Sequence, residues 1–199
     1  MKHVLLLLVC ICTYSCIQFN PPYAGMEESH PWFKLQEMDF ARDEVYVKDT
    51  NASLYKMDGE VLKNVISHSQ KQYFLLYSFD IFCSNLNCRF YDTVVRQFHD
   101  HNEVALLLVS AESPVFRTSI EECFKSFGYP VFMLDPYRYG SKRNTSPDRR
   151  FNSFLSEINP LTKLDDSSNS FLLLDKNMKV LLEGDYSSDT KQQIITLIQ

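Results

Sequence analysis

The sequence predicts an α/β fold in which helices cover both faces of a mainly parallel β-sheet. Three observations lead to this prediction. From residue 51 onward, apolar runs of strand length alternate with segments of helical periodicity. The apolar runs are continuous, as is typical of parallel strands that are buried on both faces. Near the C-terminus, two such runs flank a short polar turn, which predicts an antiparallel pair within the same sheet.

The first half of this region supplies two strands and two helices. Residues 51–59, NASLYKMDG, predict a short strand and a turn, and residues 60–69, EVLKNVISHS, predict a helix with one apolar side. Residues 72–79, QYFLLYSF, are an apolar and aromatic run of strand length. Residues 87–101, NCRFYDTVVRQFHDH, follow as a helix, because their apolar residues fall on one stripe.

The second half continues the alternation and ends with a hairpin and a helix. Residues 103–111, EVALLLVSA, and 129–135, YPVFMLD, predict buried strands, and a helix between them is predicted at 118–128, TSIEECFKSFG. A polar stretch then contains a short helix around residues 151–158, FNSFLSEI. Residues 170–185, SFLLLDKNMKVLLEGD, predict the hairpin, and residues 189–199 a closing helix capped by Ser187 or Ser188. The expected sheet has about five strands.

The N-terminus has the features of a secretory signal. Lys2 and His3 precede an apolar run over residues 4–12, which is too short to span a bilayer, and TYSC follows at 13–16. This segment resembles a bacterial lipoprotein signal, in which residues 1–15 are removed and Cys16 becomes the acylated first residue. The alternative is ordinary cleavage nearby that leaves Cys16 unmodified. The resemblance implies an exported protein, anchored by lipid to a membrane and facing the periplasm or the cell surface.

The remainder of the chain fits one domain with a lead-in. Residues 16–48 contain prolines and mixed charge without a sustained period, and are interpreted as a lipid tether and lead-in. Residues 49–199 then form the single domain. Apolar residues make up 45% of the chain and aromatic residues 14%, which is enough for a core. The net charge of −5, without a basic cluster, argues against a nucleic-acid partner.

The cysteines define the candidate chemistry. The chain has six, of which Cys10 and Cys12 leave with the signal and Cys16 is assigned to lipid. Cys123 lies on the apolar stripe of its predicted helix, so we expect a buried, inert thiol there. Cys83 and Cys88 remain for redox chemistry, at the turn from the strand 72–79 into the following helix.

No metal or other cofactor is expected. The histidines nearest the cysteine pair in the sequence, His99 and His101, lie near the far end of the predicted helix. At about 1.5 Å of rise per residue they would be some 15 Å from Cys88, too far to share a metal ion with it.

The spacing of the cysteine pair limits its geometry. If both residues were helical, their Cα atoms would lie about 8.6 Å apart, beyond the roughly 7 Å that a disulfide tolerates. Either Cys83 lies in the loop before the helix, or the first helical turn unwinds when the pair is oxidised. A nearby helix N-terminus and Arg89 favour the thiolate, whereas Asp80 disfavours it.

The hairpin and the strand before it resemble the TlpA-type thioredoxin-like lipoproteins of Gram-negative bacteria. The resemblance rests on YPVFMLDP at 129–136 and on the FLLD–turn–KV–G shape of residues 170–185, and it extends from Leu54 to the C-terminus. It implies a thioredoxin-like fold and thiol–disulfide exchange with exported proteins that bear thiols or disulfides. The chain departs from the family in its C-x-x-x-x-C spacing. It also has Asn169 at the position where the family has a cis-proline.

A second resemblance concerns the cysteine segment alone. CSNLNCRFYD, residues 83–92, is similar to the peroxidatic and resolving cysteines of bacterioferritin-comigratory-type peroxiredoxins. Those enzymes have a hydroxyl residue three positions before the first cysteine and a proline seven before it, where this chain has Asp80 and Leu76. Three functions therefore remain open: a thiol–disulfide oxidoreductase in which Cys83 attacks and Cys88 resolves, a thiol peroxidase, and a non-catalytic envelope lipoprotein with a structural disulfide.

Overall fold

The computed structural model describes residues 37–40, 54–79, 94, 96–98, 101–111, 130–139, 146–164, 170–185 and 187–198. Within these ranges the strands are β1 (Leu54–Met57), β2 (Tyr73–Ser78), β3 (Val104–Ser110), β4 (Val131–Leu134), β5 (Ser170–Asp175) and β6 (Val180–Asp185). The helices are α3 (Gly59–His68), α6 (Pro136–Tyr139), α7 (Pro147–Ile158) and α8 (Ser188–Ile198).

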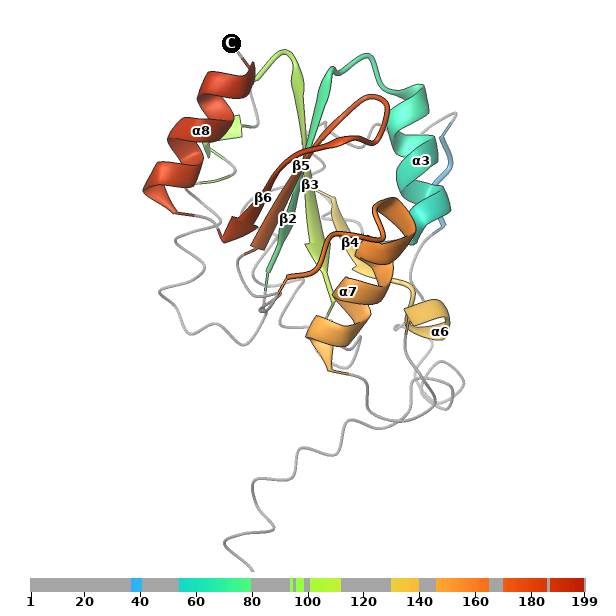
Figure 1. Ribbon diagram of the computed structural model, residues 1–199. Coiled ribbons are helices and arrows are strands. Elements are labelled where there is room, and N and C mark those ends of the chain that lie inside the picture. The colour runs from blue at the N-terminus through green and yellow to red at the C-terminus, as the bar shows by residue number, and fades with distance from the viewer. Residues whose placement is uncertain are drawn as a thin grey trace, which may run out of the picture.

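The strands form one mixed sheet in the order β1-β4-β3-β2-β5-β6. Neighbours from β1 to β2 are parallel, whereas β2 pairs antiparallel with β5, and β5 antiparallel with β6. Figure 1 shows this sheet in the middle of the molecule, with α8 on one side and α3 and α7 on the other. Parallel strands need such covering helices because their connections cross over the faces of the sheet.

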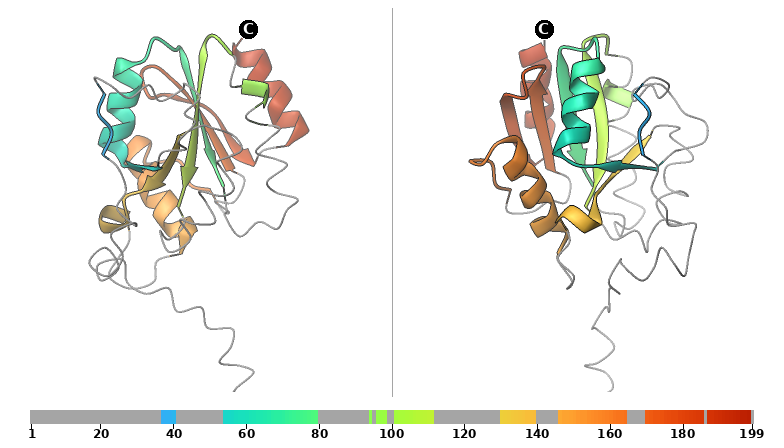
Figure 2. Two further views of the ribbon diagram at one scale, coloured as in Figure 1. Left: turned by 180° about the vertical axis from the view of Figure 1, so that it is seen from behind. Right: turned by 90° about the vertical axis from the view of Figure 1, so that its right-hand side faces the viewer.

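Each face of the sheet has its own apolar core. The first cluster joins β-strand residues such as Phe74 and Leu172 to Leu62 of α3 and Phe154 of α7. The second joins the opposite strand faces to Ile194 and Ile198 of α8, and to Val94 and Phe98. The two sides of the sheet are visible in both views of Figure 2. The alternation of strand side chains between the clusters follows from the two-residue period of a strand.

This arrangement confirms the predicted fold. The chain has an α/β, thioredoxin-like architecture: a central mixed sheet, helices on both faces, and a C-terminal β-hairpin followed by a helix. Among the described residues the sheet has six strands rather than about five, and the short strand predicted within 51–59 is its edge strand β1, which pairs with β4 along four residues.

Two helices differ from the sequence prediction at their starts. α7 begins at Pro147 rather than near residue 151, because Ser146 caps it by accepting a hydrogen bond from the Arg149 backbone, and proline suits the first helical position. α3 begins at Gly59 because the Asp58 carboxylate accepts from the Val61 N–H at 2.8 Å. The segment DG, interpreted as a turn, is therefore a helix cap.

Several predictions concern residues outside the described ranges. These are the signal peptide and tether, the lipidation site Cys16, the pair Cys83 and Cys88, the position Asn169, and the helix at 118–128. Within the described residues, no helix combines the length and the apolar composition that crossing a membrane requires.

Candidate functional site

The carboxyl ends of four parallel strands meet at one edge of the sheet, which we call the carboxyl edge. There β2 ends at Ser78, β3 at Ser110 and β4 at Leu134. β2 has a parallel neighbour on one side and an antiparallel neighbour on the other, so the direction of the sheet changes beside it. In open α/β sheets, ligands bind outside the carboxyl ends of the strands, so the carboxyl edge is the candidate location of a site.

Three buried serines lie where β2 and β3 end and β5 begins. Ser78, Ser110 and Ser170 are each at most 1% exposed. Ser170 belongs to this edge because the next residue, Phe171, pairs with Tyr77 of β2. Most other buried residues of the sheet are apolar, so this edge differs in polarity from the core below it.

The structure describes both flanks of the predicted cysteine pair. On the N-terminal flank, β2 pairing continues one residue past the strand, where the Phe79 N–H donates to Val109 at 3.2 Å. Phe79 itself is buried. On the C-terminal flank, Val94 and residues 96–98 are helical, and Val94 and Phe98 pack in the second core cluster. The structure therefore contains the strand predicted before Cys83 and part of the helix predicted at 87–101, while the two cysteines lie outside the described residues.

One guanidinium is anchored at the same edge. Arg150, from the first turn of α7, donates through Nη1 to the backbone oxygen of Ala111 at 3.2 Å. Ala111 directly follows β3, the parallel neighbour of β2. A half-buried positive charge is therefore present next to the end of the central strand.

Comparison with known proteins gives matches in three dimensions but not in sequence. No protein-family model matches the chain, and no curated protein sequence matches it. A crystal structure of a thioredoxin-like protein from Aeropyrum pernix matches with a TM-score of 0.45 and 12% identity, over 66% of this chain and 81% of that one. A thiol-disulfide oxidoreductase from Bacteroides fragilis matches with a TM-score of 0.41 and 12% identity, over 64% and 82%. The assignment of the fold rests on the strand order and the terminal hairpin.

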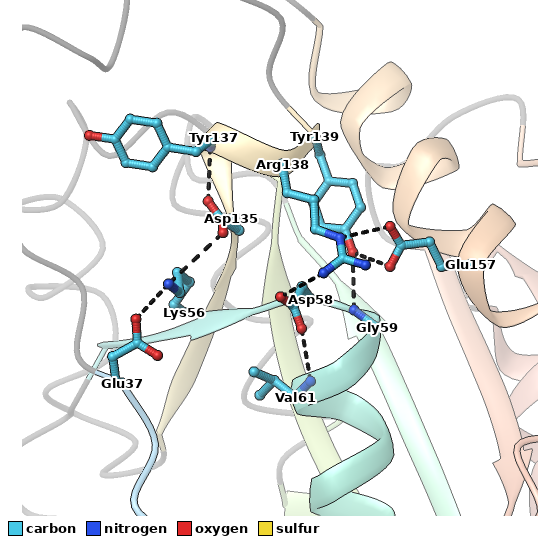
Figure 3. Close-up of polar contacts among 10 residues, drawn as sticks. All are labelled: Glu37, Lys56, Asp58, Gly59, Val61, Asp135, Tyr137, Arg138, Tyr139 and Glu157. Carbon is cyan, nitrogen blue, oxygen red and sulfur yellow. Dashed lines mark hydrogen bonds and ion pairs between the residues drawn. The ribbon is translucent and has the colours of Figure 1, made fainter.

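A polar network occupies the other half of the carboxyl edge, beyond β1 and β4. We call Asp58, Gly59, Arg138, Tyr139 and Glu157 the Tyr139 network (Figure 3). The Tyr139 hydroxyl donates to Glu157 Oε2 at 2.8 Å and accepts from the Gly59 N–H at 3.0 Å. Arg138 donates to Glu157 Oε1 at 2.9 Å and to Asp58 Oδ2 at 3.1 Å. The network therefore connects the start of α3, the short helix α6 and the end of α7.

The electrostatics of the network follow from burial and pairing. Burial raises the pKa of Tyr139. The hydrogen bond to Glu157 raises it further, because only the protonated phenol can donate this bond. The hydrogen bond to Glu157 raises the pKa of Arg138. Tyr139 is only 6% exposed, whereas the Arg138 side chain is 44% exposed, so the phenol is the desolvated member.

A smaller set of contacts lies beside it on β1 and β4. Lys56 hydrogen-bonds Glu37, which raises the pKa of Lys56, and lies 4.0 Å from Asp135. Asp135 in turn accepts from the Tyr137 N–H, and Figure 3 shows the Tyr137 ring pointing away from the Tyr139 network. These contacts hold residues near 37 against the edge strand β1.

The sequence did not reveal the Tyr139 network. α6 lies in a segment interpreted only as polar, and the partners of Tyr139 are 18 and 80 residues away. The one local signal was Asp58 before a helical stripe, which is the pattern of an N-cap. Among the described residues there is no group of three or more His, Cys, Asp or Glu side chains that could hold a metal ion.

Proposed function

We propose that this protein is an exported thiol–disulfide oxidoreductase that uses Cys83 and Cys88. The observation that carries the proposal is the position of β2. β2 is the interior strand beside which the sheet changes direction, and its described pairing extends to Phe79, four residues before Cys83 in the sequence. Four residues span at most about 14 Å, and this short reach supports a reactive Cys83 near the carboxyl edge.

Sequence adjacency supports the same site from the other side of β2. Asn169 is bonded to Ser170, the buried first residue of β5. Residue 169 therefore directly precedes β5, the strand next to β2. The resemblance to TlpA-type proteins implies that the residue at this position packs against the cysteines. An asparagine offers an amide there in place of a proline ring.

The proposed reaction is a two-electron exchange. The Cys83 thiolate attacks one sulfur of a partner disulfide, which forms a mixed disulfide and releases the partner's other sulfur as a thiolate. The Cys88 thiolate then attacks Cys83, which breaks the mixed disulfide and releases the second partner thiolate. The partner gains two electrons and the Cys83–Cys88 pair is oxidised to a disulfide. The reverse sequence oxidises a dithiol partner.

Trapping tests the reaction. Cys88→Ser removes the resolving thiol, so mixed disulfides with exported thiol or disulfide proteins should accumulate through Cys83 and disappear on reduction. Cys83→Ser/Cys88→Ser should trap nothing, and Cys123→Ser should behave as wild type. No trapped partner, combined with a reduction potential below about −300 mV, would identify a structural disulfide instead. Rapid sulfenic acid formation at Cys83 with peroxide turnover would identify a peroxidase.

The lipid anchor is a separate part of the proposal. The motif TYSC at 13–16, after a short apolar run, supports acylation of Cys16 and attachment to a membrane of the cell envelope. Metabolic labelling with a fatty acid should mark the wild-type protein but not Cys16→Ala. Equal labelling of both proteins, or of neither, would refute the anchor without affecting the redox proposal.

A further inference from the structure

β6 is the outermost strand of the sheet on the hairpin side. In the part of the chain that the structure describes, it pairs only with β5, so its outer backbone groups face away from the sheet. Exposed edges of this kind accept an added strand from another polypeptide. Figure 1 shows β6 on the far side of β5 from β2, with α8 nearby.

A hollow of about 400 Å³ borders β6 on the α7 side. It is lined by Asn159, Leu161, Thr162, Val180, Leu181, Leu182 and Glu183. Val180 and Glu183 point toward this side, because they pair with Leu174 and Leu172 of the α7-side core.

The carboxylate in this hollow is held in place. The buried Thr162 hydroxyl donates to Glu183 at 2.8 Å. The segment that carries Thr162 is fixed by two hydrogen bonds of 2.9 Å between the Asn152 amide and the backbone of Leu164. The hollow therefore presents an oriented carboxylate next to Leu161, which is 91% exposed.

A second hollow, of about 630 Å³, lies on the opposite face between β6 and α8. It is lined by Leu181, Leu182, Asp189, Gln192, Gln193, Thr196 and Leu197. The five α8 residues have the spacing of one helical face. Leu182 points to this side because it pairs with Leu173 of the α8-side core. Leu197 is 45% exposed.

The two hollows have lining residues of the same chemical kind. Each combines leucine side chains with a single charged group among its described lining residues, Glu183 in one and Asp189 in the other. Lysine and arginine have a matching structure, because their aliphatic stems pack on apolar surface while their charged ends reach a carboxylate. Consecutive residues of a strand point to opposite faces of a sheet. Two adjacent basic residues in an extended segment would therefore enter the two hollows at once.

We propose that the outer edge of β6 binds an extended segment of another polypeptide that carries two adjacent basic residues. Backbone hydrogen bonds to β6 align the segment, one basic side chain binds beside Glu183, and the next binds beside Asp189. The pairing between β5 and β6 is irregular at Leu173 and Leu174. Regular pairing of β6 with an added strand is therefore limited to the residues from Leu182 onward. The bound segment is therefore short, about four residues of strand.

Synthetic peptides test the proposal by fluorescence anisotropy. The protein used is the full mature chain carrying Cys83→Ser/Cys88→Ser, so that thiol exchange contributes nothing and failure of the redox proposal leaves this test unaffected. The probe is the labelled, end-blocked peptide TVKKVT. One comparison peptide is TVKVKT, whose two lysines fall on the same face of a strand, and the other is TVEEVT. We expect TVKKVT to bind at least threefold more tightly than TVKVKT, and TVEEVT not to bind.

Protein variants locate the binding to the edge. Glu183→Gln and Asp189→Asn should each weaken TVKKVT binding by roughly three- to fivefold, the range of a partly exposed ion pair. Glu60→Gln changes an exposed acid in the first turn of α3 and should leave binding unchanged. Circular dichroism should show that all variants remain folded. Equal affinity for TVKKVT and TVKVKT, or unchanged binding in both edge variants, would overturn the proposal. Sedimentation showing a dimer that Leu197→Lys dissociates, without peptide binding, would also overturn it.

Discussion

Gly59 donates its backbone N–H to the hydroxyl oxygen of Tyr139, which lies 80 residues later in the chain, at 3.0 Å. Gly59 is the first residue of α3, where backbone donors have no partner within the helix. Tyr139 ends α6 and is buried. The hydroxyl of this one side chain therefore satisfies a helix terminus and donates a hydrogen bond to Glu157 of α7.

Removing the Tyr139 hydroxyl should destabilise the fold. Tyr139→Phe leaves the Gly59 N–H and one Glu157 oxygen without their partner in a largely buried position, so we expect a loss of about 1–2 kcal/mol in the free energy of unfolding. Urea denaturation measures this loss. The control is Tyr137→Phe, in which the neighbouring side chain is 55% exposed and a smaller change is expected. Equal effects of the two substitutions would contradict the structural role of Tyr139.

The same phenol should make stability fall at alkaline pH. Its pKa is higher in the folded protein than the value of about 10 in an unfolded chain. Above pH 10 the unfolded state therefore binds fewer protons than the folded state, and the stability contributed by protonated Tyr139 is lost as pH rises toward the folded pKa. The slope from this group is at most about −1.4 kcal/mol per pH unit. Unfolding measured between pH 9 and 11 should show a shallower decline in Tyr139→Phe than in the wild type.

Alanine at position 59 should destabilise the protein, although alanine is usually the better residue in a helix. A Cβ atom there would lie 2.5 Å from Glu157 Oε2, so the carboxylate must move away from Tyr139 and Arg138. We expect Gly59→Ala to cost about 1–2 kcal/mol by the loss of these hydrogen bonds. In a Glu157→Ala background the same substitution should cost much less. A double-mutant cycle with a coupling energy near zero would exclude this collision as the cause.

Arg150 should influence the proposed reactive thiol. Its guanidinium is anchored to Ala111 at the end of β3, and a nearby positive charge favours a thiolate. Arg150→Gln should raise the pKa of Cys83 by roughly a few tenths of a unit, because the substitution removes a positive charge that solvent partly screens. The pH profile of iodoacetamide alkylation in Cys88→Ser measures it. Arg149→Gln, which changes the adjacent exposed arginine, should leave the profile unchanged.

Local sequence patterns were sufficient for most elements of the fold. The apolar runs that became β2, β3 and β5 are buried on both faces, so they are continuous in the sequence and easily recognised. α3 and α8 were close to their predicted bounds, because each has a single apolar stripe and a polar residue before it. The start of α7 was missed although Ser146 and Pro147 are a known start signal, because the apolar stripe begins only at Phe151.

Contacts between distant segments were not predictable in the same way. The antiparallel pairing of β2 with β5 decides where the sheet changes direction, and no local period records it. The strand-to-helix turn in the sequence was enough to suggest the carboxyl edge as the candidate site, but its buried serines and Arg150 could be found only from the folded arrangement. The hollow on the α7 side of β6 depends on where the segment after α7 lies, and that segment is held by the side chains of Asn152 and Thr162.

The strand order also determines when each part of the sheet can form during synthesis. β4 lies between β1 and β3, so both of its neighbours leave the ribosome before it does. β1 pairs only with β4 among the described strands, and this pairing joins Leu54 to Val131. Such non-local pairing is slow because a long loop must close before any contact is gained. Until residues 131–134 emerge, the side of β3 that receives β4 remains an open edge. An export pathway that receives the chain before this point would receive it incompletely folded.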